Sequence, residues 1–307
     1  MKRIARAFLV LVILLTTIQS SAIGEPNRPK VLRIAYVRIL SSDSNTAEKF
    51  YTKLAAIKST PAKNADNSET CVWCEIEQDQ LFAHIGDQVV LIRDDSPSPQ
   101  NRINEIFFEV SDATKMEHYM ASKGVPIRSS TPRLRYFDVL DPEGHRIGFV
   151  QRPENPQHKK KDSSLWPLIH AGFVVRDRAS MDHFYKDILG FKPYWHGGMK
   201  DGQTDWVSLQ VPDGTGWVEF MLNVPADANK RLLGIMNHVA LGVPDIHAAA
   251  KQLLTNGVKL TEEPKMGRDG KWQLNLYDPD QTRVELMEFS PVEKPCCSDY
   301  TGPHPKP

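Results

Sequence analysis

The sequence predicts an α+β fold of four strand–helix–strand–strand–strand (βαβββ) units, paired into two domains. An apolar strand, an amphipathic helix and further strand-like runs recur four times. The spacing also recurs, because His170 and Gly190 are 20 positions apart and His238 and Gly257 are 19 apart. A polar, basic segment at 153–165 separates two pairs of units. One unit cannot bury its sheet, whereas two units side by side can curl their sheets around a shared cleft.

Residues 1–22 predict a secretory signal peptide. Basic "MKRIARAF" precedes apolar "LVLVILLTTI", and "SSA" offers small residues before a cut after Ala22. The apolar run is short for a membrane span, which makes an uncleaved anchor the less favoured alternative. We therefore expect an exported protein, periplasmic or secreted, with no membrane contact after cleavage.

Residues 30–152 form the predicted N-terminal domain. Its first unit starts with a strand and helix over 33–58 and fits the pattern loosely, and the strands after residue 70 are hard to place. The second unit is clearer: Glu105 and the helix-ending Gly124 are again 19 positions apart.

Residues 166–290 form the predicted C-terminal domain. In the third unit, apolar residues recur at helical spacing after the strand: Met181, Phe184, Tyr185, Ile188 and Leu189. Gly190 then ends the helix. The fourth unit continues from its helix into "VKLTEEP", "KWQLNLYD" and "TRVELMEF", read as strands. The Pro-rich tail, 291–307, has too few apolar residues to form a core and is expected to lie loose or across the surface.

Composition limits the partners. Lys and Arg number 38, as do Asp and Glu, so the formal net charge is zero and nothing favours nucleic acid. A small-molecule substrate and a monomer or homodimer are expected. The four cysteines are read as structural disulfides or free thiols, with three possible pairings: Cys71, Cys74, Cys296 and Cys297.

Four polar residues stand at matching places in the third and fourth units. His170 and His238 open apolar strands, and Glu219 and Glu285 lie within later ones. A buried carboxylate costs several kcal/mol unless it is paired. Two neutral imidazoles and two carboxylates suit one borderline divalent ion: zinc, nickel, cobalt, iron or manganese. The sequence therefore predicts a metal site.

This order of ligands resembles the vicinal-oxygen-chelate superfamily, which includes glyoxalase I, extradiol dioxygenases and bleomycin-resistance proteins. The four positions follow at intervals of 49, 19 and 47, an order that resembles bacterial glyoxalase I. "DPDQTRVELMEF" also resembles the family's Asp-Pro-Asp-Gly-x-x-x-Glu ending, with Gln281 in place of glycine. The resemblance implies two glyoxalase-like domains and is strongest over 166–290.

Aligning the units predicts that the N-terminal domain is degenerate and binds no metal. Arg33 is placed at the first histidine's position and Glu105 at the second's. Gly148 stands in place of Glu285, and valines of "DQVVLIRD" stand near the position of Glu219.

The resemblance to glyoxalase I implies a metal-dependent isomerase or lyase that acts through an enediolate on a small, oxygen-rich substrate. Glu285 would be ligand and general base, with Glu219 as its near-symmetric catalytic counterpart. Tyr194, His196 and Trp206 are predicted to bind the substrate. Export argues against a glutathione adduct as that substrate.

Two other functions remain open. An extradiol ring-cleaving dioxygenase would use His170, His238 and Glu285 as ligands. However, Asn275 stands where that family's signature has a tyrosine, and the window upstream has no histidine. A non-catalytic small-molecule or drug-binding protein could use the same cleft.

We predict that the mature protein begins near Ile23, because the signal peptide is cut after Ala22. N-terminal sequencing of protein made in its native host measures this. Protein that starts at Met1 and is recovered from the cytoplasm would contradict export.

Overall fold

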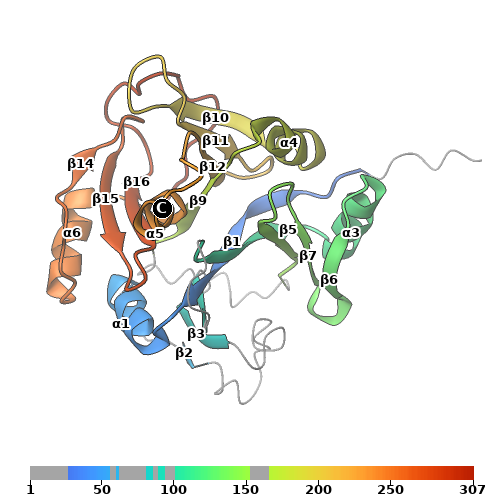
Figure 1. The fold of residues 1–307 in the computed structure, drawn as a ribbon, viewed down its shortest axis with the longest axis horizontal. Coiled ribbons are helices and arrows are strands. Elements are labelled where there is room, and N and C mark those ends of the chain that lie inside the picture. Colours follow the sequence, from blue (N-terminus) through green and yellow to red (C-terminus); the bar gives the residue numbers. More distant parts are fainter. Residues whose placement is uncertain (1–26, 56–59, 62–80, 86–88, 94–100, 153–165) are drawn as a thin grey trace, which may run out of the picture.

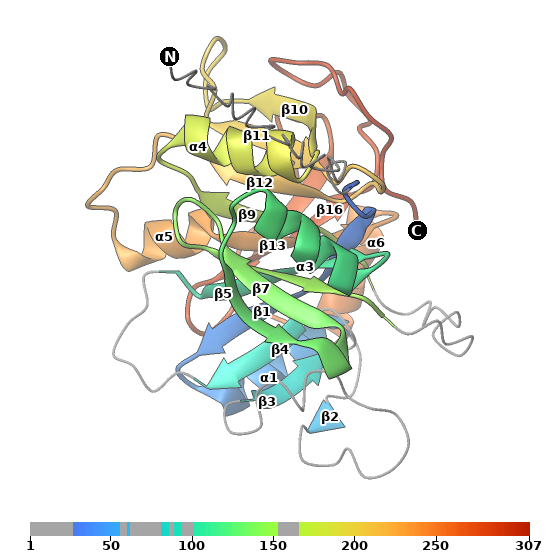
Figure 2. The same ribbon diagram turned by 90° about the vertical axis from the view of Figure 1, so that its right-hand side faces the viewer.

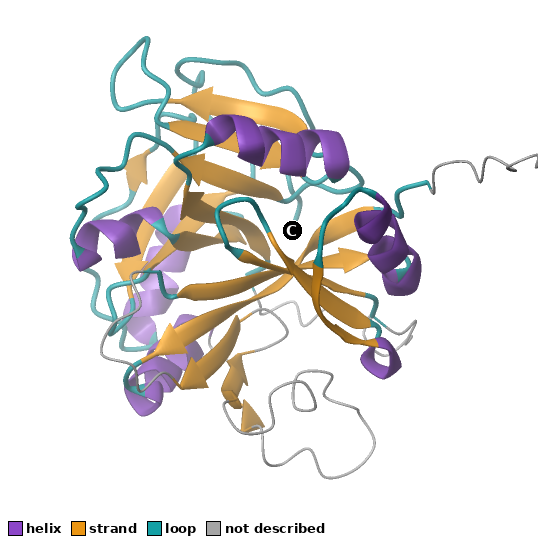
Figure 3. Ribbon diagram, turned by 45° about the vertical axis from the view of Figure 1, so that its right-hand side comes forward, coloured by secondary structure: helices purple, strands orange, loops and turns teal. Residues whose placement is uncertain are grey.

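The computed structural model describes residues 27–55, 60–61, 81–85, 89–93, 101–152 and 166–307. The predicted signal peptide, the segment 153–165, Cys71 and Cys74 lie outside these ranges. Two curled sheets carry helices on their outer faces (Figures 1 and 3). The α+β class with βαβββ units is thus confirmed. Within the described ranges, no helix combines the length and hydrophobicity of a membrane span.

The first sheet has the strand order β2-β3-β4-β1-β5-β8-β7-β6. Its strands are β1 (Val31–Ser41), β2 (Thr60–Pro61), β3 (Leu81–Ile85), β4 (Val89–Arg93), β5 (Ile103–Val110), β6 (Ile127–Thr131), β7 (Tyr136–Leu140) and β8 (Arg146–Val150). Its helical segments are α1 (Ser44–Ala55), α3 (Ala113–Ser122) and the short 3₁₀ turn η2 (Pro132–Leu134).

The second sheet repeats this arrangement, with the order β10-β11-β12-β9-β13-β16-β15-β14. Its strands are β9 (Leu168–Val174), β10 (Lys192–Gly197), β11 (Trp206–Gln210), β12 (Trp217–Met221), β13 (His238–Val243), β14 (Lys265–Met266), β15 (Trp272–Tyr277) and β16 (Arg283–Glu288). Its helical segments are α4 (Arg178–Asp182), which continues as the π-helical η4 (His183–Ile188), α5 (Lys230–Met236) and α6 (Ile246–Thr255).

Each unit starts its helix in the same way. An aspartate side chain accepts a hydrogen bond from the backbone N–H three residues later, which satisfies a donor of the first turn. These aspartates are Asp43, Asp112, Asp177 and Asp245. Gly124, Gly190 and Gly257 follow the helices with φ near +75°, a left-handed conformation that favours glycine.

Two segments of the second sheet differ from the sequence interpretation. Residues 258–264, read as a strand, have no regular structure before the short β14. There the Glu262 carboxylate instead accepts hydrogen bonds from Asn275 Nδ2 and Tyr277 Oη. The helix α5, capped by Asn229, was not expected from the sequence and leads into β13.

The tail lies across the second sheet, one of the two arrangements expected. The Thr301 N–H donates to the Tyr194 carbonyl at 3.0 Å, and the Cys296 N–H donates to the Arg268 carbonyl at 2.7 Å. The Gln210 side chain donates to the Pro303 carbonyl at 2.8 Å. Cys296 and Cys297 form a disulfide with each other.

Two buried tyrosines join the two sheets. The Tyr51 hydroxyl of α1 donates to Asp278 at 3.0 Å, and the Tyr185 hydroxyl of η4 donates to Asp141 at 3.3 Å. Each aspartate begins the Asp-Pro turn before the last strand of the opposite sheet. As a result α1 packs against the fourth unit, and α4 lies beside α3 of the second unit (Figures 1 and 2). The Tyr119 hydroxyl of α3 donates to the Ile188 carbonyl at 2.7 Å.

We predict that Tyr51→Phe lowers the free energy of unfolding by about 1.5–3 kcal/mol, the range for a hydrogen bond to a charged group. Burial raises the pKa of Asp278 to about 6, so its carboxyl is mostly ionised at pH 7.5. Tyr119→Phe is the matched control: its hydroxyl donates to a neutral carbonyl, and its loss should cost only about 0.5–1.5 kcal/mol. Urea denaturation at pH 7.5 measures both. Equal losses would contradict a charge-assisted contact at Asp278.

Candidate metal centre

Strand pairing brings the four predicted ligands to one face of the second sheet. Antiparallel pairing of β9 with β13 places His170 opposite Ala240. Parallel pairing places Glu219 of β12 opposite Gly172 and Glu285 of β16 opposite Ala240. Side chains of directly paired residues point the same way, and those two positions apart share a face. All four ligand side chains therefore lie inside the curl of the sheet.

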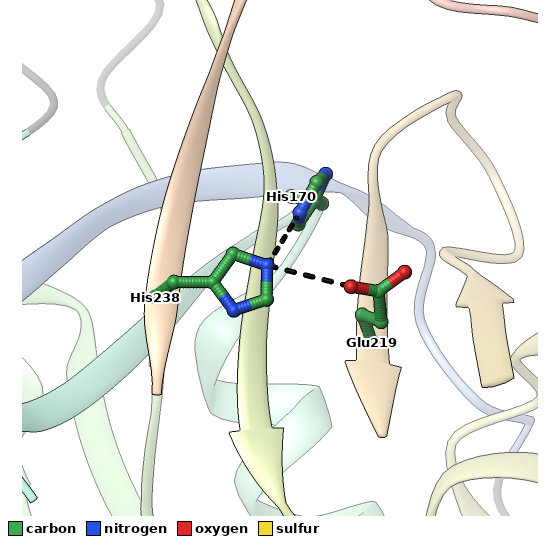
Figure 4. Close-up of side chains that lie close together, drawn as sticks. All are labelled: His170, Glu219 and His238. Carbon is green, nitrogen blue, oxygen red and sulfur yellow. Dashed lines mark hydrogen bonds and ion pairs between the residues drawn. The ribbon is translucent and has the colours of Figure 1, made fainter. Parts of the chain in front are cut away.

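The ligand atoms converge closely (Figure 4). Nε2 of His170 lies 3.0 Å from Nε2 of His238, and a Glu219 carboxylate oxygen lies 3.4 Å from His238 Nε2. A Glu285 oxygen lies 3.8 Å from His170 Nε2 and 3.7 Å from His238 Nε2. Two nitrogens bound to one ion at about 2.1 Å and a right angle lie about 3 Å apart. The ligand atoms of His170, Glu219 and His238 all lie within 4.8 Å of one another and fit one divalent ion, and Glu285 lies beside this group.

Burial prepares both imidazoles to be ligands. It lowers the pKa of His170 and His238 well below the usual value, so both rings are neutral at pH 7. Nδ1 of His238 lies 3.0 Å from the Met236 carbonyl oxygen, which accepts a hydrogen bond from the ring N–H. That tautomer leaves the Nε2 lone pair pointing at the other ligands. Burial also raises the pKa of Glu285 to about 7.

Gly172 makes room for this arrangement. A Cβ atom at Gly172 would lie only 2.0 Å from the nearest atom of the His238 ring. Any other residue would displace the ring from its place beside Glu219. Only a residue without a side chain fits at this position beside the His238 ring.

The N-terminal sheet shows which residues occupy the equivalent places. Glu105 pairs with Arg146 as His238 pairs with Arg283, which agrees with the alignment of Glu105 to the second histidine. Tyr36 is opposite Phe107, as His170 is opposite Ala240. The first histidine's place therefore belongs to Tyr36, and the assignment to Arg33 is wrong. Bulges on either side of Ile34 shift the register of β1.

A simple count along the sequence identifies these positions. In each unit, the residue at the histidine position lies seven residues before the aspartate that caps the helix. These residues are Tyr36, Glu105, His170 and His238. In the first sheet, Val90 takes the place of Glu219 and Gly148 takes the place of Glu285. Val90 pairs with Arg38, and Gly148 pairs with Phe107.

In the first sheet, two arginine side chains lie beside the Glu105 carboxylate. Arg38 contacts it at 2.6 Å and Arg146 at 3.2 Å, and the Tyr136 hydroxyl donates to it at 3.1 Å. Arg38 stands at the position equivalent to Gly172, so its side chain reaches into the space that a histidine ring occupies in the second sheet.

A cavity of about 450 Å³ opens in front of Glu219 and Glu285. Six aromatic residues line it: Tyr194, Trp195, Trp206, Trp217, Tyr277 and Tyr300. Tyr194 and Trp206, which the sequence predicts to bind the substrate, are among these lining residues.

His196 does not line this cavity. A bulge between Pro193 and Trp195 turns both Tyr194 and Trp195 inward and leaves the His196 side chain exposed. Tyr300 was missed, because the tail has no periodic pattern that would direct a side chain to the sheet.

Sequence comparison identifies one match. The model of the Glyoxalase/Bleomycin resistance protein/Dioxygenase superfamily matches residues 168–286, the span that holds all four ligands. No curated protein sequence matches the chain.

The fold is similar to solved structures of ring-cleaving enzymes. Homoprotocatechuate 2,3-dioxygenase from Arthrobacter globiformis matches with a TM-score of 0.58 and 17% identity, over 91% of this chain and 84% of that one. An extradiol ring-cleaving dioxygenase from B. fuscum matches with a TM-score of 0.59 and 18% identity, over 86% of this chain and 73% of that one. At such low identity the likeness concerns the fold, and it spans both sheets.

We predict that the purified protein binds about one divalent ion per chain and that His238→Ala abolishes binding, because one ligand is lost without replacement. Binding should weaken below about pH 7, where protons compete for Glu285. His183→Ala is the matched control, since His183 is an exposed helix residue paired with Asp187. Elemental analysis after dialysis measures the stoichiometry. Full occupancy in folded His238→Ala protein would exclude this centre.

Proposed function

Because residues 168–286 belong to the glyoxalase, bleomycin resistance protein and dioxygenase superfamily, we propose that the protein is a metal-dependent enzyme acting on a small substrate with two adjacent oxygens. His170, His238 and Glu285 would hold the ion, with Glu219 beside them. When bound, a divalent ion in this place polarises the substrate oxygens as a Lewis acid.

The reaction that we propose first is ring opening of a catechol-like substrate by dioxygen. Two histidines and one carboxylate on one face are typical of non-haem iron(II) oxygenases, so iron or manganese is the proposed ion. The observation that carries this choice is the likeness of both sheets to extradiol ring-cleaving dioxygenases. This favours the ring-cleaving alternative over the isomerase expected first from the sequence.

The cavity residues support a flat, aromatic substrate. Trp217 and Tyr194 lie in tilted contact, with ring centroids 5.1 Å apart, and both line the cavity. Their faces offer stacking surfaces for a ring. The Glu219 carboxylate, next to His238 Nε2, is placed to accept a proton from a substrate hydroxyl.

One observation favours a second candidate, the glyoxalase-type isomerase or lyase. Glu219 lies closer to His238 Nε2 than Glu285 does, 3.4 Å against 3.7 Å, which suits a fourth ligand. In that case Glu285 would take the proton from the carbon beside a carbonyl, and dioxygen would not be needed.

We predict that iron(II)- or manganese(II)-loaded protein consumes dioxygen with a catechol and forms a coloured ring-opened product. Glu219→Gln should keep the ion but lower the rate about 10²- to 10⁴-fold, the usual effect of losing a general base. Glu285→Gln should lower the occupancy of the ion. An oxygen electrode, absorption spectra and elemental analysis measure these outcomes.

The opposite pattern would favour the isomerase. No dioxygen uptake with a panel of catechols, together with turnover of a thiol–dicarbonyl adduct without oxygen, would refute ring cleavage. In that case Glu285→Gln would keep the ion and lose the rate.

A further inference from the structure

Lys271 is a buried lysine close to the candidate metal centre, and neither candidate reaction uses it. It lies just before β15, whose Asn275 and Tyr277 line the metal cavity. The Lys271 side chain is fully buried, and among the described residues its Nζ has no hydrogen-bond partner. Burying an ammonium group without a direct partner is costly, which calls for a compensating interaction.

Three aromatic rings surround the ammonium group. Nζ lies 4.7 Å from the ring centre of Trp217, 5.0 Å from that of Tyr300 and 5.7 Å from that of Tyr194. Such distances allow cation–π attraction, which partly replaces lost hydration. All three rings line the metal cavity, so the positive charge lies directly behind its wall.

Nearby carboxylates also affect the charge of Lys271. Buried Asp269 accepts hydrogen bonds from the Lys271 backbone N–H and the Tyr300 hydroxyl. Burial lowers the pKa of Lys271 to about 8, while attraction to Asp269, Glu285 and Glu219 opposes that effect. The side chain is therefore mostly charged at pH 7.

We propose that Lys271 is a positioning residue that selects negatively charged, oxygen-chelating substrates. Its fixed charge attracts an anion that enters the cavity and repels the metal ion itself. The same selection would serve an ionised catechol or an enediolate. The inference rests on the proposed metal centre but not on the choice between the two reactions.

A purely structural role predicts something different. If Lys271 only fastens Tyr300 and the tail to the sheet, its loss would loosen the cavity and weaken every ligand. A charge effect instead moves cation and anion binding in opposite directions. The sign of the two changes therefore separates the roles.

The test compares Lys271→Met with Lys271→Arg, which keeps the charge. Lys251→Met is the matched control, because it removes an exposed lysine of helix α6. Cobalt(II) titration of the full-length protein, followed by absorption, measures metal affinity. Acetohydroxamate, an anion that chelates through two oxygens, then titrates the cobalt-loaded protein. It belongs to neither proposed substrate class.

In Lys271→Met we expect cobalt to bind on the order of tenfold more tightly and acetohydroxamate on the order of tenfold more weakly. Lys271→Arg and Lys251→Met should stay close to the unmodified protein. Unchanged affinities in folded Lys271→Met, or a loss of both, would overturn the proposal. Should Lys271→Met fail to fold, Lys271→Gln provides the neutral variant.

If neither neutral variant folds while Lys271→Arg does, the charge serves the fold and the proposal is wrong. Failure of the unmodified protein to bind cobalt would refute the metal centre itself, which is a separate outcome.

Discussion

The antiparallel pairing of β9 with β13 is the constraint on which the candidate site depends. It sets His238 opposite Gly172 and His170 opposite Ala240, and so brings the two Nε2 atoms to 3.0 Å. A slip of one residue would turn one histidine to the outer face, because strand side chains alternate. The flanking parallel pairs then add one carboxylate from each side. The chemistry of the site is thus decided by backbone hydrogen bonding.

Much of this could be predicted from sequence, because alternation and helix capping are local. The seven-residue interval from His170 to Asp177 recurs from His238 to Asp245, and the four ligands lie on the strands expected. The errors come from bulges. The place of the first histidine was assigned to Arg33, and His196 was placed in the cavity, because bulges in β1 and β10 interrupt the regular alternation of side chains. The seven-residue interval to the capping Asp43 does not include the bulges before Tyr36, and it identifies Tyr36.

The tail could not be predicted for another reason. Residues 291–307 have no hydrophobic periodicity, and their place is set by backbone bonds to Tyr194 and Arg268 that only the folded sheet presents. Tyr300 and the surroundings of Lys271 follow from that docking. The buried charge of Lys271 and part of the aromatic cavity wall thus depend on the contact between the tail, which has no regular secondary structure, and strand β10.

The contact of Tyr51 with Asp278 bears on how the two halves could diverge. The Asp-Pro turn that receives this hydroxyl leads directly into β16, the strand of Glu285. The N-terminal half has Tyr36 and Glu105 in the places of the two histidines, yet its helix α1 supports the turn behind a ligand of the other half. We therefore expect a substitution on the face of α1 that carries Tyr51 to disturb the second sheet more than one in the cleft of the first sheet. The N-terminal half thus contributes to the candidate site by supporting, from behind, the turn that leads to Glu285.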